Sequence, residues 1–175
     1  MVVSLGGRKL AFFAGGLHRW QGGRSELAST VTSSDSLRFD FVDHVMLIVH
    51  GDVVPDEGDW ARMISVRNAN RERIRSNLVV APPRATINAA QRADIVQFIR
   101  ETGTSIAVVT DSALIRGIAR AVGFLGVQVR AFPPTDLAGA LNFLVVPPSR
   151  HADWARRIEA LKAQLATGAA QQKRA

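Results

Sequence analysis

The sequence predicts an α/β fold, in which a mixed, mostly parallel sheet is opened by a β-hairpin and has helices packed against it. Two observations lead to this prediction. First, the β-like runs LRFDFV and VMLIVHG stand on either side of Asp43-His44, a short polar turn. Second, apolar runs of strand length alternate with segments of helical length after Gly51. Strands that alternate with helices are typical of parallel sheets.

The hairpin is predicted from its two hydrophobic patterns. From Leu37 onward, apolar residues alternate with Arg38 and Asp40, which indicates a strand with one buried face. Val45–Val49 is apolar without interruption, as in a strand that is covered on both faces. We therefore expect Val45–Val49 to be a central strand of the sheet.

The elements after the hairpin are bounded by capping and breaking residues. Asp59 can cap a helix over about residues 60–75, because its carboxylate can accept from a free backbone N–H. The apolar run NLVVA then predicts a buried strand that ends at Pro82-Pro83. A second helix is expected from near Thr86 to just before Gly103, with one apolar face.

A second βαβα unit completes the predicted domain. The strand IAVVT leads into Asp111-Ser112, and a helical pattern follows at once. The strand VQVRAF and a short helix, TDLAGALNFL, come next and end at Pro147-Pro148. Composition divides the chain into a Gly-, Ser- and Thr-rich flexible extension (1–35), the α/β domain (36–146) and a C-terminal amphipathic helix with a basic tail (147–175).

The C-terminal helix is predicted from a single apolar stripe, which Ser149 can precede as a cap. Three roles are open for it: packing on its own domain, contact with a partner or a second copy, or contact with a membrane surface. Because residues 36–146 already show a complete pattern, we expect that domain to close its core alone, and we expect a polar, frayed tail from Gly168. The stripe consists of Trp154, Ile158, Leu161 and Leu165.

Composition excludes several kinds of chemistry. The chain has no cysteine, so it has neither disulfides nor thiol catalysis. Its three lysines are Lys9, Lys162 and Lys173, so the predicted domain lacks the lysine of a phosphate-binding loop, a kinase or a response regulator. The four histidines have no metal-binding or triad spacing. No run is long enough to span a membrane or to form a signal-peptide core, so we expect a cytoplasmic protein without cofactors.

The net charge of +7 is concentrated in the two ends of the chain. Residues 37–145 carry a balance of only +1, which argues against nucleic acid as a partner of the domain. The exception is an arginine cluster in SVRNANRERIRSN. We interpret this cluster as a solvated helix face near a C-terminus, with a phosphate or partner contact as the alternative. Its members are Arg67, Arg71, Arg73 and Arg75.

The order and lengths of the predicted elements over residues 36–144 resemble the STAS-like (SpoIIAA-like) domain family, as do the pieces NAAQR, VVTDS, RGI and RAF between Ala89 and Phe132. The resemblance implies a non-enzymatic regulatory module. In the anti-sigma-factor antagonists of that family, an Asp-Ser pair caps the helix after the third strand, and its serine is phosphorylated. Here that position offers Thr86 and no serine, so the resemblance does not carry over a phosphorylation switch.

Asp111-Ser112 has two interpretations. Both residue types favour helix N-caps, so the pair is predicted to cap the following helix. Alternatively, Ser112 and the first backbone N–H groups hold an anion, with Arg116 one turn further on. Ligands collect beyond the carboxyl ends of parallel strands, where Thr86, Asp111 and Pro133 should lie.

Two functions from different classes follow. The first is a non-enzymatic regulatory or scaffold module that binds a protein partner, a second copy or a small anionic ligand. The alternative is an enzyme that acts on an anionic substrate at the carboxyl edge of the sheet. The candidate ligand or partner contacts are Thr86, Asp111, Ser112, Arg116 and Trp154.

Overall fold

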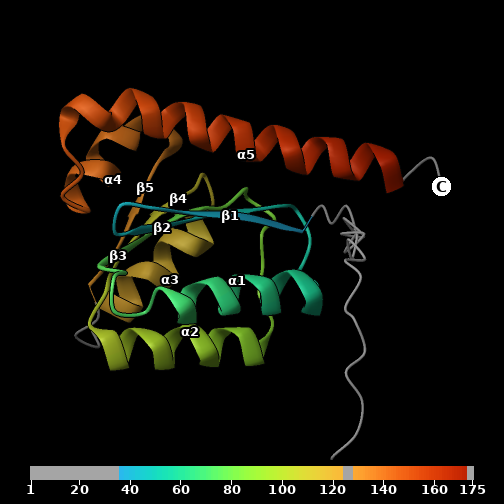
Figure 1. Ribbon diagram of the computed structural model, residues 1–175, viewed down its shortest axis with the longest axis horizontal. Coiled ribbons are helices and arrows are strands. Elements are labelled where there is room, and N and C mark those ends of the chain that lie inside the picture. The colour runs from blue at the N-terminus through green and yellow to red at the C-terminus, as the bar shows by residue number, and fades with distance from the viewer. Residues whose placement is uncertain (1–35, 124–127, 173–175) are drawn as a thin grey trace, which may run out of the picture. The chain divides into compact units, whose positions relative to one another are not determined.

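The computed structural model describes residues 36–123 and 128–172 and confirms the α/β class (Figure 1). The expected flexible extension, residues 1–35, lies outside the described residues. The strands are β1 (Leu37–Val42), β2 (Val45–His50), β3 (Ser76–Val80), β4 (Ser105–Val109) and β5 (Val129–Phe132). The helices are α1 (Glu57–Ala69), α2 (Ala89–Thr102), α3 (Ala113–Gly123), α4 (Leu137–Phe143) and α5 (His151–Gln172), with 3-10 turns at Pro134–Asp136 and Pro148–Arg150.

The five strands form one sheet in the order β1-β2-β3-β4-β5. β1 pairs antiparallel with β2, and the other neighbours are parallel. The predicted hairpin is confirmed, with Asp43 at φ +56° in its two-residue turn. β2 lies between β1 and β3, so the prediction of a central strand at Val45–Val49 is also confirmed.

Helices cover both faces of the sheet, and the alternation of side chains along the strands separates two cores. Figure 1 shows α4 and α5 above the sheet and α1 and α2 below it. Val45, Leu47 and Val49 pack in the core beneath α4 and α5. Met46, which points the other way, packs with Met63 of α1. This two-sided cover explains why β2 is apolar at consecutive positions.

Helix α5 belongs to the larger core, which corrects an expectation from the sequence. Trp154 is only 1% exposed, and Ile158 and Leu165 are also buried against the sheet. The prediction that residues 36–146 close their core alone is therefore wrong, because α5 supplies the cover for one face of β1 and β2. The helix also continues through Gln172, so the frayed tail does not begin at Gly168.

The caps of the first two helices differ from those predicted. Asp56 caps α1 by accepting from the backbone N–H of Asp59 at 2.8 Å, so the assignment of the cap to Asp59 is wrong. The Asp59 side chain is buried and accepts from Ser36 Oγ at 2.6 Å. Asn88 and Gln91 form a capping box at the start of α2, later than the start expected near Thr86.

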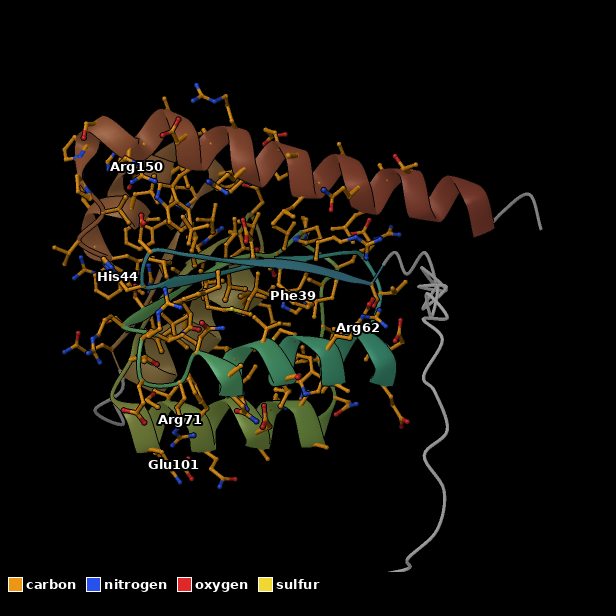
Figure 2. The ribbon with its side chains drawn as sticks, viewed as in Figure 1. Phe39, His44, Arg62, Arg71, Glu101 and Arg150 are labelled. Carbon is orange, nitrogen blue, oxygen red and sulfur yellow. The ribbon has the colours of Figure 1, made fainter. Side chains whose placement is uncertain are left out.

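Arg67 and Arg71 of the arginine cluster are built into the structure, which corrects their interpretation as part of a solvated face, whereas Arg73 and Arg75 are exposed. Arg67 is buried and donates two hydrogen bonds to Asp94, at 2.7 and 2.9 Å, while its guanidinium lies 4.4 Å from the centre of the Phe98 ring. Figure 2 shows Arg71 and Glu101 at neighbouring ends of α1 and α2, where their side chains pair at 2.7 Å. These contacts tie α1 to α2.

The end of α4 places a β-branched residue in a backbone conformation that normally requires glycine. Val146 N–H donates to the Leu141 carbonyl at 2.9 Å, and Val145 N–H donates to the Asn142 carbonyl at 3.0 Å. This is a Schellman motif in which Val145 holds the left-handed position, at φ +60°. The Val145 side chain is exposed, so it gains little packing in return for this strain.

Replacing Val145 by glycine should raise the free energy of unfolding by about 1 kcal/mol, because the left-handed conformation costs an L side chain roughly 1–2 kcal/mol. Chemical denaturation would measure the change. Val145→Ala is the matched control, because alanine keeps the Cβ atom that clashes. If both substitutions raised the free energy of unfolding equally, or if glycine lowered it, the backbone at Val145 would not be strained.

Candidate functional site

A cleft of about 400 Å³ lies at the carboxyl ends of β2, β3 and β4, and residues of α5 form its outer wall. The ends of the strands and the Pro82-Pro83 pair contribute apolar groups. Ile158 of α5 contributes another. This is the edge at which the sequence predicts a ligand. The polar residues that line the cleft are His50, Asp111, Glu159 and Lys162.

His50 borders the cleft from the end of β2. It stands opposite Leu37 in the antiparallel register, and cross-strand partners project from the same face, so the imidazole lies on the face that α1 covers. Its Nδ1 atom is buried and has no hydrogen-bond partner among the described residues. Burial lowers the pKa of His50 to about 4, so the ring is neutral at pH 7. His50 and Asp111 therefore border one cleft without forming an acid–base pair.

Ser112 caps α3, as the sequence predicts. Its Oγ accepts from the backbone N–H of Ile115 at 3.3 Å, and its own N–H donates to Thr110 Oγ1 at 3.1 Å. Arg116 donates to the Thr110 carbonyl at 3.2 Å, so its guanidinium braces the turn. Within the described part of the chain, the exposed Asp111 carboxylate has neither an ion pair nor a hydrogen bond to a partner.

The remaining sequence candidates do not join this site. Thr86 is exposed in the loop between β3 and α2 and does not line the cleft. Trp154 was expected as a partner contact, but it is buried under α5 and presents no surface to a partner. The cleft also gives an anion little attraction, because the Lys162 ammonium is paired at 2.8 Å with Glu159 and the Asp111 carboxylate stands nearby.

The face of α3 that points away from the sheet is a feature that sequence reasoning missed. Leu114 is 74% exposed and Ile118 is 54% exposed, one turn apart, while Ala119 is buried. Gly117 lies on the same exposed side, and a Cβ atom built there would meet nothing within 4 Å. Leu114, Ile115 and Ile118 lie on a different side of α3 from Arg116 and Arg120, so the sequence shows an apolar face but not that part of this face stays uncovered. Packing against β5 covers only one side.

The described residues support neither a metal site nor a membrane-spanning helix. In the ranges 36–123 and 128–172, no group of three or more His, Asp or Glu side chains is placed to hold a metal ion. Among the helices described there, none is long and apolar enough to cross a membrane. In the comparisons with known proteins, no family model, curated protein or solved structure matches the chain.

Proposed function

We propose that this protein is a non-enzymatic regulatory or scaffold module that works through protein–protein contact, and that the α3 face is its contact surface. The exposed pair Leu114 and Ile118 is the observation that carries the proposal. Large apolar side chains that stand one turn apart on a helix, with the bare backbone of Gly117 beside them, form a surface that a partner can cover. The cleft at the carboxyl edge supplies no comparable argument for turnover.

A second copy of the chain fits this surface best. In an antiparallel two-fold contact, Leu114 of one copy can lie opposite Ile118 of the other, because both belong to a self-complementary patch. One helix from each copy makes a small interface, so we expect weak, concentration-dependent association.

A charge placed in the apolar patch tests this arrangement. Leu114→Asp or Ile118→Asp should abolish the dimer, because each would bury an unpaired carboxylate in the apolar contact. Sedimentation velocity over a range of protein concentrations would measure the association. Val54→Asp, which changes an exposed apolar residue outside α3, is the control and should leave it unchanged. A wild-type chain that stays monomeric at every concentration would refute the second copy as the partner.

Cross-linking gives an independent test, because the natural chain contains no cysteine. Gly117 lies close to the proposed two-fold axis, so the two copies of residue 117 would stand about 3 Å apart along the helix direction. Gly117→Cys should therefore form an intermolecular disulfide rapidly under mild oxidation, as measured on non-reducing gels. Ala93→Cys, at an exposed position of α2, should not. Equal cross-linking of both variants would show random collision instead of a specific contact.

A further inference from the structure

A second cleft, of about 310 Å³, lies at the opposite end of the sheet from the first. It is formed by the hairpin turn, the amino ends of β3 and β4, and the end of α4. Its lining residues include one arginine, one histidine and two serines, but no residue with a carboxylate. The lining residues are His44, Arg75, Ser76, Ser105, Phe143, Leu144 and Val145.

The two serines stand side by side in this cleft. Ser76 pairs with Ser105 in the parallel register of β3 and β4. Each is two residues before a side chain of the larger core, Leu78 and Ala107 respectively, so both point toward the face that α4 covers. Ser105 Oγ donates to Gln128 Oε1 at 2.9 Å. Ser76 is only 4% exposed, and its buried Oγ has no hydrogen-bond partner among the described residues.

Arg75 lines the same cleft and is its source of positive charge. Its backbone N–H donates to the His44 carbonyl at 2.8 Å, which fixes its position next to the hairpin turn. The Arg75 side chain is exposed and, within the described residues, has neither an ion pair nor an aromatic partner. The nearest turn carboxylate, Asp43, is paired with Arg150 at 3.4 Å. Figure 2 shows His44 and Arg150 at this end of the molecule.

We infer that this cleft binds a small oxyanion, namely a phosphate or carboxylate group. The Arg75 guanidinium would donate to the anion, and a planar guanidinium matches either oxyanion in a two-pronged arrangement. The Ser76 hydroxyl would donate its hydrogen to the same group. A buried hydroxyl without a partner is unfavourable, and an oxyanion acceptor removes that cost. This site lies on the α4 side of the sheet, so it does not rest on the proposed role of α3.

Titration with inorganic phosphate and, separately, with acetate tests the inference and distinguishes the two anion classes. Amide chemical shifts should move at residues 44, 75, 76 and 105, with chloride at equal ionic strength as the reference. Arg75→Gln should weaken binding by about tenfold or more, because a charged hydrogen bond is lost. Arg84→Gln removes the same charge from an exposed loop outside the cleft and should bind as the wild type does. An equal loss of anion affinity in both variants would overturn the site. So would the absence of any change in amide chemical shifts with either phosphate or acetate.

Ser76→Ala separates a ligand contact from a structural role. Without anion, this variant should unfold at the same or a higher temperature than the wild type, because an unsatisfied buried hydroxyl is removed. Its affinity for the anion should fall by roughly two- to tenfold, the value of one hydrogen bond. A variant that is less stable without anion, yet binds phosphate or acetate as tightly as the wild type, would show that the Ser76 hydroxyl has only a structural role.

Discussion

Replacing Trp154 by alanine should lower the free energy of unfolding by about 3–5 kcal/mol. The Trp154 side chain is almost fully buried between α5 and the sheet, so the substitution removes a large apolar group and leaves a cavity. A domain of this size has only about 5–15 kcal/mol of stability in total. Thermal unfolding followed by circular dichroism should therefore show a midpoint lower by roughly 10 °C.

The control for this prediction lies on the same helix. Gln164 is exposed, so Gln164→Ala should change the stability by less than about 0.5 kcal/mol. Deletion of residues 149–175 should have the largest effect, because it removes Trp154, Ile158 and Leu165 together and uncovers one face of β1 and β2. A truncated chain that unfolds cooperatively at the wild-type midpoint would show that α5 is separable from the core.

Acidification from pH 7 to pH 5 should remove about 2 kcal/mol of stability through His50 alone. Burial lowers the folded-state pKa of His50 from 6.5 to about 4. The unfolded chain therefore takes up a proton below pH 6.5, while the folded chain does not until near pH 4. The stability that the neutral, buried His50 contributes is thus complete above pH 6.5, and it is lost progressively as the pH falls from 6.5 to about 4. By pH 4 the loss should reach about 3 kcal/mol.

A comparison of two histidine variants isolates this effect. His50→Leu cannot take up the proton, so its free energy of unfolding should depend less on pH between 7 and 5 than that of the wild type. His44 is exposed in the hairpin turn, and His44→Gln controls for the loss of a histidine elsewhere. Urea denaturation at several pH values would measure each slope. If His50→Leu keeps the full wild-type slope, the acid sensitivity arises from other groups.

The sequence by itself determined the class of fold and the order of its elements. Alternation at Leu37–Val42 and the unbroken apolar run at Val45–Val49 predict the hairpin and the central strand, because side chains alternate between the faces of a sheet. The Asp111-Ser112 pair likewise identifies the start of α3, where Ser112 provides the cap. Such local signals act over a few neighbouring residues, so they can be read without knowing the rest of the chain.

Tertiary structure alone decided which surfaces are covered. The apolar stripe of α5 and the pair Leu114 and Ile118 of α3 look alike in the sequence, yet the first is buried and the second is exposed. Likewise, Arg67 is buried only because α2 brings Asp94 and Phe98 to it. Amphipathic patterns show that a face is apolar but not what lies against it, because burial depends on contacts between residues that are distant in the chain.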